Sequence, residues 1–506
     1  MVRRSLLLLL LFPTTAYCQT GGPGGRARIE ILNADLWVFE DSVAPGAQRL
    51  KGNVRFQHAN AIMSCDSAWL MADQSVDAYG DVHIRQGDTL TITSERLHYT
   101  AADRTAQLDG NVHLTDPGTE LSTEHLIYDL RSRVATYVGG GTIRSRKDNN
   151  TLESQRGSYL AGERQFRFSG GVRLTHPERT ITSDTLHYDT RTGVAHFFGP
   201  TDIVQAGTII HCNAGSYDTR LERARFRKRA TIASRGQVLE GDSLHYDRNT
   251  GIGLAWGNVS VLDTVNALAV KGDHGRFNEL EDRSMITGHA ELVMDMDGDT
   301  LFLHGDTLHA TRDSSGNGRR IEARHRVRFF KSDLQGVCDT MIHAEADSMI
   351  HLLGSPFLWS NADQISGDRI RLQLAQGRMH RLYVDRNAFM ASRSDSVHFD
   401  QVAGTTMTGF FEENDLRRIL AEGNGRTIYF AKESVEGVDR TMGMNKAECS
   451  NIEVKVLKNE VNTVTFLGRP DAVLYPIDKV PEGGMQLKGF VWNEEARPKD
   501  RASIFP

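Results

Sequence analysis

The chain of 506 residues is poor in proline and cysteine and carries no excess of basic charge. Only 12 prolines stand against 47 glycines, so regularly spaced glycines indicate bends in a β protein rather than a disordered segment. The 59 basic residues are outnumbered by 65 acidic ones, which argues against a general nucleic-acid binder, because such proteins have basic surfaces.

Common catalytic and metal-binding phrases are also missing. The sequence has no Gly-x-Ser-x-Gly, His-Glu-x-x-His, P-loop or Cys-x-x-Cys phrase. We therefore predict no catalytic residue, no metal site and no cofactor. After the first residues, no apolar run is long enough to span a bilayer.

The N-terminus has the pattern of a secretory signal. Arg3 and Arg4 precede an apolar run at residues 6–12, and small residues follow before Cys18. Cleavage after Cys18 would give an exported chain with 57 basic and 65 acidic residues, a net charge of −8. The alternative is a lipoprotein acylated on Cys18. Residues 19–28 are rich in glycine and are predicted to form a flexible leader.

Four cysteines would remain after cleavage: Cys65, Cys212, Cys338 and Cys449. Export would permit disulfides. Positions that are far apart in a stacked repeat stay far apart, however, so we predict free, buried thiols.

A glycine phrase returns about every 30 residues along the chain. Its clear copies begin at Gly52, Gly80, Gly110 and Gly170, and degenerate copies reach Gly468. A fixed period of this length marks a repeat architecture, and we predict about fourteen repeats.

A second phrase alternates with the glycine phrase. Its clearest copy runs from Ser183-Asp184 through Tyr188 into a turn that ends at Gly193. Asp closes such a turn by bonding its own backbone, and Gly supplies positive φ. We expect the glycine at one bend of each repeat and the Ser-Asp or Gly-Asp pair at the other. The large aromatics are expected mainly at bends, at Trp69, Tyr99, Tyr128, Tyr188, Tyr246 and Trp256.

Apolar and polar residues alternate between these phrases. Val112 and Leu114, for example, flank His113, and Val172 and Leu174 flank Arg173. This period of two predicts strands with one apolar and one wet face. Short turns make consecutive strands antiparallel neighbours, so the predicted fold class is all-β. A doubtful amphipathic helix is seen only at residues 412–420.

Several polar groups could suggest a site, but each has a simpler interpretation. The repeat histidines alternate with the apolar residues and are interpreted as solvated: His98, His187, His245 and His309. The group His304, Asp306 and His309 is the best local metal candidate, yet it is the repeat phrase with one histidine added. Residues 295–299 resemble a calcium loop, but the glycine is misplaced, which favours a tight acidic turn. The recurring aspartates are interpreted as groups that close the bends: Asp66, Asp184, Asp242, Asp273, Asp306 and Asp368.

The period loosens after about residue 310, where residues 313–318 form a predicted loop insertion. We predict one repeat segment at residues 29–310 and a more degenerate one at 311–480. Residues 481–506 are expected to cap the stack or to extend as a tail.

The signal, the Gly-Asn-Val phrase and the Ser-Asp-x-Leu-x-Tyr phrase together resemble the OstA-like family. This family includes the periplasmic lipopolysaccharide-transport bridge LptA and the N-terminal domain of the outer-membrane receptor LptD. The closest phrasing is at residues 48–205, and the stretch from Leu467 to Trp492 resembles the ending of long OstA-like proteins of Bacteroidota. The chain departs from the bridge protein in its greater length.

The resemblance implies an elongated, open V-shaped β jelly roll that shields acyl chains without catalysis. Its implied location is the periplasm, with association with the outer membrane as an open alternative. The implied partners are lipopolysaccharide or a related glycolipid, inner-membrane exporter components and an LptD-type receptor, joined by edge-strand pairing. Candidate lipid contacts are Val54, Phe56, Val82, Ile84, Val112, Leu114, Val172, Leu174, Val259 and Val261. Two alternatives stay open: a polysaccharide-acting β-helix enzyme, and a structural β scaffold with a filled core.

Overall fold

The computed structural model describes residues 28–506 apart from 59–60, 88–89, 116, 146–148, 161, 206, 235, 265–266, 297, 313–318, 345, 376–377, 414, 436–437 and 458–459. The predicted signal and the leader up to residue 27 lie outside the described residues, as does the predicted loop insertion. Contacts divide the chain into two compact units: Met1–Arg235 with Asp242–Asn249, and Gly236–Gly241 with Thr250–Pro506. The segment boundary predicted near residue 310 falls inside unit 2.

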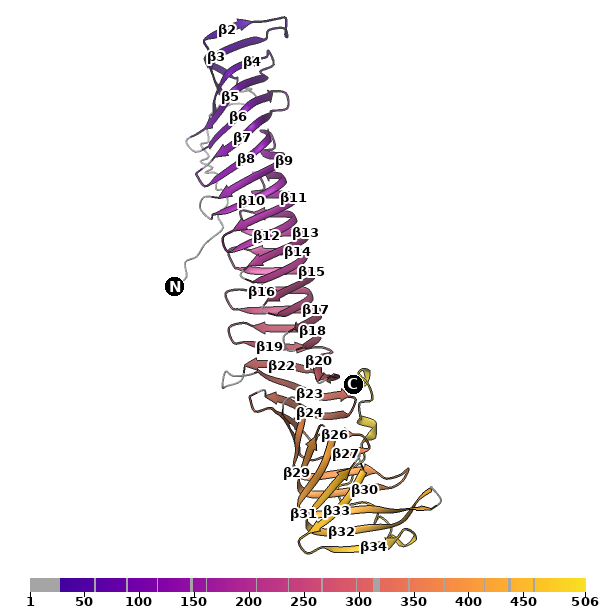
Figure 1. The fold of residues 1–506 in the computed structure, drawn as a ribbon. Coiled ribbons are helices and arrows are strands. Elements are labelled where there is room, and N and C mark those ends of the chain that lie inside the picture. The colour runs from indigo at the N-terminus through magenta and orange to yellow at the C-terminus, as the bar shows by residue number, and fades with distance from the viewer. Residues whose placement is uncertain are drawn as a thin grey trace, which may run out of the picture. The chain divides into compact units, whose positions relative to one another are not determined.

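Unit 1 is a stack of antiparallel strands, each paired with the next in the chain from β3 onward (Figure 1). Its strands are β1 (Glu30–Asn33), β2 (Leu36–Phe39), β3 (Gln48–His58), β4 (Ala61–Leu70), β5 (Val76–Gln86), β6 (Leu90–Thr100), β7 (Thr105–Thr115), β8 (Thr119–Asp129), β9 (Val134–Ser145), β10 (Asn150–Leu160), β11 (Gln165–His176), β12 (Arg179–Asp189), β13 (Val194–Gln205), β14 (Thr208–Asp218) and β15 (Arg223–Ser234). Strand β16 (Gln237–Asp247) contains residues of both units.

Unit 2 continues the antiparallel pattern, but several of its strands are split in two. Its strands are β17 (Ile252–Asp263), β18 (Leu268–Asn278), β19 (Arg283–Thr287), β20 (Glu291–Met296), β21 (Asp299–His304), β22 (Thr307–Arg312), β23 (Arg319–Lys331), β24 (Leu334–Ala344), β25 (Met349–Leu353), β26 (Phe357–Ser360), β27 (Asp363–Ser366), β28 (Arg369–Ala375), β29 (Arg378–Arg393), β30 (Phe399–Glu412), β31 (Asp415–Val435), β32 (Val438–Leu457), β33 (Glu460–Leu467) and β34 (Asp471–Pro476). Three short 3-10 helices follow: η1 (Ile477–Lys479), η2 (Glu494–Ala496) and η3 (Ala502–Ile504).

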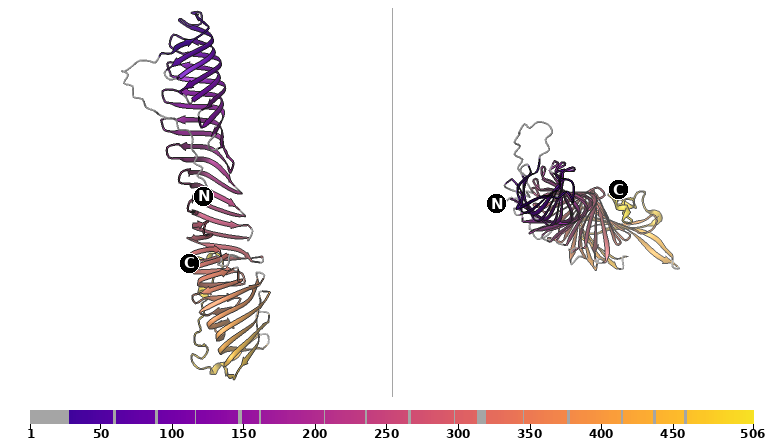
Figure 2. Two further views of the ribbon diagram at one scale, coloured as in Figure 1. Left: turned by 90° about the vertical axis from the view of Figure 1, so that its left-hand side faces the viewer. Right: turned by 90° about the horizontal axis from the view of Figure 1, so that it is seen from above.

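The predicted all-β, repetitive antiparallel fold is confirmed. Consecutive strands of unit 1 lie side by side in both the front and the turned views (Figure 2). The stretch at residues 412–420, for which the sequence shows no convincing helix, ends β30 and begins β31, and Glu412 pairs with Asp415. Backbone hydrogen bonding to the neighbouring strands makes this stretch β, because a weak local helical pattern contributes little stability where strands can pair on both sides.

A bulge divides most strands of unit 1 into two halves. In β7, Gly110 (φ 77°) and Asn111 (φ 45°) are both left-handed, and the register with β8 shifts between Asp109 and Val112. Such a bulge inserts an extra residue and bends the strand. Gly and Asn adopt this conformation at low cost, which explains why the glycine phrase recurs.

An acidic or polar residue that precedes the strand in sequence fills the space over most of these glycines. A Cβ added to Gly80 would lie 2.3 Å from Oδ2 of Asp66, and one added to Gly110 would lie 2.6 Å from Oε2 of Glu95. The Asn111 amide donates to the same Glu95 carboxylate at 2.6 Å. The two sequence phrases therefore form one bend together. Our expectation of two separate bends per repeat was wrong, because cross-strand register brings residues about 14 positions apart into contact.

The hairpin turns have the predicted construction. Oδ1 of Asp189 accepts hydrogen bonds from the amides of Arg191 and Thr192 at 2.8 and 3.0 Å, and Gly193 has φ 79°. Successive turns also bond to one another, since the amide of Thr219 donates to the Gly193 carbonyl at 2.9 Å.

In unit 2, some strands are interrupted at the bend, so that each half belongs to a different wall. Strand β18 pairs with β20 through Leu268–Lys271 and with β19 through His274–Asn278. Gly288 and His289, both left-handed, stand between β19 and β20. Residues from both walls, such as Ile286 and Leu292, belong to one apolar cluster, so the walls enclose a shared interior.

The C-terminal segment from residue 477 to 506, which we call the strap, runs back along the outer face of unit 2 (Figure 1). Gln364 donates to the Val491 carbonyl at 2.6 Å and accepts from the Asn493 amide at 2.8 Å. Gln401 holds Met485 and Leu487 in the same two-bond manner. Both glutamines are buried, so water does not compete for the hydrogen bonds between their side-chain amides and the backbone of the strap.

Charged and aromatic contacts hold the rest of the strap. Arg501 makes two hydrogen bonds, of 2.6 and 2.7 Å, to the buried carboxylate of Glu291. Arg497 donates to Oε1 of Gln335 at 2.7 and 2.9 Å. The strap thus adds a second layer over unit 2, and the expected tail is a docked element in the structure.

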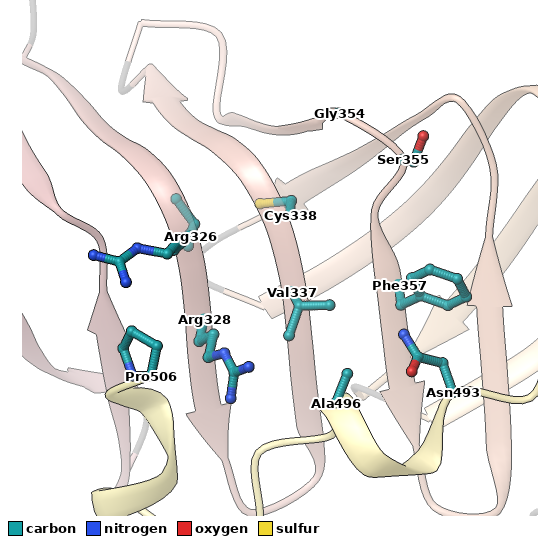
Figure 3. Close-up of a pocket in the computed structure, with 11 residues that line it drawn as sticks. Arg326, Arg328, Val337, Cys338, Gly354, Ser355, Phe357, Asn493, Ala496 and Pro506 are labelled. Atoms are coloured by element: carbon teal, nitrogen blue, oxygen red, sulfur yellow. The ribbon is translucent and has the colours of Figure 1, made fainter.

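A cavity of about 310 Å³ lies between the strap and the sheet. Arg326 and Arg328 line it from β23, Phe357 lines it from β26, and Asn493 and Ala496 close it from the strap (Figure 3). Arg326 pairs with Asp306 at 2.8 Å and Arg328 reaches the Ser503 carbonyl at 3.4 Å, so both guanidinium groups have partners here.

All four cysteines in the described part of the chain are free thiols, as predicted. Cys65, Cys212 and Cys338 are buried, while Cys449 is only partly so. Burial raises the pKa of Cys65 and Cys212 to about 11 and that of Cys338 to about 12.

The Gly110→Ala variant is expected to lower the free energy of unfolding by about 1–3 kcal/mol, because its left-handed backbone disfavours a Cβ. Urea denaturation would measure this. The matched control is Gly162→Ala, where an added Cβ has no atom within 4 Å. The reverse change, Lys228→Gly, should raise stability, because Lys228 has φ 61° in the same kind of bulge. Equal effects at Gly110 and Gly162 would contradict this account of the bend.

Gln364→Met should release the strap locally, because the Val491 carbonyl and the Asn493 amide lose their buried partner. Hydrogen exchange should quicken at residues 490–494 while exchange in unit 1 is unchanged. Gln107→Met, an exposed change in unit 1, is the control. Unchanged exchange in the strap would show that the glutamine does not hold it.

In the native protein at pH 8, iodoacetamide should modify Cys449 first and leave Cys65, Cys212 and Cys338 largely intact. The thiolate is the reactive form, and burial raises the pKa of all four thiols, so the order follows accessibility, which is greatest at the partly buried Cys449. Mass spectrometry after timed quenching measures the order. Modification of Cys338 at its rate in guanidinium chloride would contradict the burial assigned to it.

Candidate functional site

The two halves of each strand in unit 1 form two walls that meet at the bends. We call the wall that contains Val54, Val82, Val112 and Val172 the valine wall, and the one that contains Tyr99, Tyr128, Tyr159, Tyr188 and Tyr217 the tyrosine wall. Apolar residues of both walls form a single cluster, so their inward faces pack against each other near the bend.

The row of inward residues beside the bend is fully buried. Val54, Val82 and Val112 have no exposed surface, and Val172 is 1% exposed. In unit 2 the corresponding Val259 is also 1% exposed. These side chains fill the angle between the walls, and each contributes about 1.5–3 kcal/mol by burial.

The next inward row of the valine wall is an unbroken series of aliphatic and aromatic residues, which we call the apolar ladder. Cross-strand register connects each member with the next: Phe56, Met63, Ile84, Ile92, Leu114, Leu121, Ile143, Leu152, Leu174, Ile181, Ile203, Ile210 and Ile232. Most members, including Ile84, Leu114 and Leu174, keep part of their surface exposed.

The outward residues next to the ladder are all polar. The register connects Arg55, Ser64, His83, Thr93, His113, Ser122, Thr142, Glu153, Arg173, Thr182, Asp202, His211 and Thr231. Beside the bend, the valine wall therefore has one apolar and one polar face along unit 1, while Ile62, Val204 and Ile209 are exposed apolar residues farther out on the polar side. Sequence reasoning found this alternation on the glycine strands and missed the ladder members on the intervening strands, such as Ile92 and Leu121, although the same period-two pattern marks them.

Large and small side chains alternate along the tyrosine wall. Tyr99 pairs with Ala106, Ala106 pairs with Tyr128, and Tyr188 pairs with Ala195. Where both neighbours are aromatic, Tyr159 and Phe166 stack with centroids 4.5 Å apart. These tyrosines lie on the inward face toward the hairpin turns. Their predicted position at the bends was wrong, because the bulge glycines occupy the bends.

The corresponding ladder in unit 2 is packed more tightly. Val261 is partly buried, whereas Leu292, Leu303 and Phe329 are at most 3% exposed. Gly336 leaves room for the Phe329 ring, since an added Cβ would lie 2.3 Å from it. Unit 1 and unit 2 thus share one repeat pattern but differ in how far their ladders are accessible.

A cavity of about 330 Å³ remains between the last strands of unit 2. Its lining is largely apolar, with Val461, Val464 and Phe466 from β33 and Leu474 from β34. Tyr429 also lines it, and burial raises the pKa of the Tyr429 phenol above its usual value.

The other candidates from the sequence lie away from the interior. His98, His187, His245 and His309 alternate with the inward residues, and burial lowers the pKa of the last three. His304 Nδ1 lies 2.8 Å from the Ala290 carbonyl and its ring packs on Phe505. Among the described residues, no three His, Cys, Asp or Glu side chains gather to hold a metal ion.

The acidic run near residue 295 is a hairpin turn, as favoured from the sequence. Met296 pairs with Asp299 across it, and Oδ1 of Asp295 accepts from the Gly298 amide at 2.9 Å. No helix in the described part of the chain is long and apolar enough to cross a membrane.

Two protein-family models match stretches of the repeat region. Residues 26–184 match the family model of OstA-like protein, and residues 269–378 match that of LptA/(LptD N-terminal domain) LPS transport protein. The LPS-assembly protein LptD of Nitrosomonas europaea is 28% identical over 120 residues, which is 23% of this chain and 16% of that protein. The chain thus spans about a sixth of the length of this curated relative.

A search of solved structures finds LptH, described as the LptA homologous periplasmic component of the lipopolysaccharide transport device of Pseudomonas aeruginosa. The match has 17% identity and a TM-score of 0.19, and it covers 20% of this chain and 76% of that one. Each unit thus contains one stretch that matches a family model, OstA-like protein in unit 1 and LptA/(LptD N-terminal domain) LPS transport protein in unit 2, and the chain is similar to proteins of this lipopolysaccharide-transport family.

Proposed function

We propose that this protein is a periplasmic carrier that shields the acyl chains of lipopolysaccharide, or of a related glycolipid, on the apolar ladder of unit 1. The observation that carries the proposal is the ladder itself: thirteen register-connected apolar residues face inward, and nine of them stay partly accessible. An ordinary core would bury such a row, as unit 2 does.

Shielding an acyl chain from water has a large physical benefit. Each methylene exposed to water costs about 0.8 kcal/mol, so an unshielded chain of about a dozen carbons costs about 10 kcal/mol. An apolar row that continues from strand to strand lets a chain move without crossing that barrier. No catalytic step is needed, and the family relatives are transport proteins rather than enzymes.

The ten predicted contact residues divide into two sets under this proposal. Ile84, Leu114, Leu174 and Val261 are the accessible contacts, and the buried residues Val54, Phe56, Val82, Val112, Val172 and Val259 support the angle beneath them. The contact row also includes other partly exposed ladder members: Met63, Ile92, Leu121, Ile203, Ile210 and Ile232.

Partners would join at strand edges. Strands β1 and β2 pair with β3, and β33 and β34 pair with β32, so edges are available in each unit. We propose that an inner-membrane exporter component and an LptD-type receptor add strands at such edges. The matches to LptA and LptD families support this assignment and the periplasmic location.

A photo-crosslinking amino acid at Leu174 is expected to capture lipopolysaccharide in cells, whereas one at Arg173 should not. The two positions are adjacent in β11, but Leu174 lies on the ladder and Arg173 on the polar face. A crosslinker at Val112 should also capture the lipid, though less efficiently than one at Leu174, because Val112 is fully buried. Immunoblotting for lipopolysaccharide on the purified adduct is the measurement.

Leu114 and His113 in β7 form a second matched pair. Equal labelling at ladder and polar-face positions would contradict the proposal. Absence of labelling at every position, with a normally folded protein, would favour the structural scaffold with a filled core.

A further inference from the structure

A row of polar residues borders the apolar ladder on the side away from the bend. Thr119, Ser145 and Asn150 are each two residues farther along their strands than a ladder member, so they face the same side. The register places Ser145 between Thr119 and Asn150 on adjacent strands. All three are buried, with at most 7% of their surface exposed.

Asn150 differs from the other asparagines of the repeat in its hydrogen bonding. It is 4% exposed, and neither its Nδ2 nor its Oδ1 has a hydrogen-bond partner. The amides of Asn53 and Asn111, in contrast, donate to Asp35 and Glu95 at the bends. A buried amide without partners costs free energy, which a ligand that supplies both a donor and an acceptor would recover.

A second unpartnered polar atom lies at the same level of the wall. Nδ1 of His58, the third inward residue of β3 counted from the bend, is buried without a partner. Asn150 is likewise the third inward residue of β10 counted from its bend. The unmet hydrogen bonds therefore belong to a row that borders the ladder.

We infer that Asn150, flanked by Thr119 and Ser145, binds the amide group that links an acyl chain to a sugar head group. An N-acyl linkage offers one carbonyl acceptor and one N–H donor, which complement Nδ2 and Oδ1. Two strand residues span about 7 Å, so a chain lying on the ladder at the partly exposed Leu121 brings its linkage to the level of Thr119, Ser145 and Asn150. The inference rests on the proposed function and names the chemical class that the carrier recognises, an N-acylated amphiphile.

The test compares two amphiphiles with equal chains, N-dodecanoyl glucosamine and dodecyl glucoside, by titration calorimetry on the full exported chain. The wild type should bind the amide about tenfold more tightly than the ether. Asn150→Leu should abolish that preference and leave the affinity for dodecyl glucoside unchanged. The matched control is Asn213→Leu, whose amide donates outward to the Lys228 carbonyl at 3.1 Å and which should keep the preference.

Thermal unfolding of the lipid-free variants provides an independent measurement. Asn150→Leu should raise the Tm, because it removes a buried polar group that has no partner, whereas Asn213→Leu should lower it. A lower Tm for Asn150→Leu with an unchanged amide preference would overturn the subsite and make the residue structural. Equal binding of both amphiphiles by the wild type would overturn the subsite and leave the carrier intact. Binding of neither would overturn the proposed function instead.

Discussion

The structure depends on the contact between a left-handed glycine and the carboxylate or amide of the strand before it. At Gly80 and Gly110, the missing Cβ leaves the space that Asp66 and Glu95 occupy. The bulge bends each strand, and the polar side chain pairs with the second bulge residue where that residue is Asn, as at Asn111. Because the contact is made between consecutive strands, each repeat sets the bend of the next one. The angle between the walls is therefore maintained by local chemistry.

Unit 1 and unit 2 use the same repeat for different packing. In unit 1 the valine wall presents polar residues outward and leaves the apolar ladder partly accessible inward. In unit 2 the outer face also carries apolar residues, such as Phe389 and Phe430, and these pack in one cluster with Leu487, Phe490 and Trp492 of the strap. The inward row of unit 2 is correspondingly buried. The strap stabilises unit 2 as a two-layered body, and the accessible apolar row belongs to unit 1.

The proposed carrier function requires no titratable group to be reactive, and the distribution of these groups agrees with that. Buried thiols have raised pKa values and so stay protonated, and the repeat histidines whose pKa is lowered stay neutral near pH 7. Carboxylates at the bends and turns, such as Glu95 and Asp189, accept hydrogen bonds from asparagine side chains or backbone amides. Nδ2 and Oδ1 of Asn150 have no hydrogen-bond partner and lie beside the ladder, where a bound lipid would supply the missing acceptor and donor.

The sequence by itself determined the all-β repeat, the period, the hairpin turns such as Asp189 to Gly193, and the two-faced alternation around His113 and Arg173. These features are local: they require only period-two patterning, the backbone bond of an aspartate and the positive φ of a glycine. Tertiary structure alone decided that the two phrases share one bend, that residues 412–420 form strands, and that the C-terminal segment docks as a strap. It also decided which inward rows are closed and which remain accessible. Those outcomes depend on register and on contacts between residues far apart in the chain, such as Glu291 with Arg501, which no local pattern contains.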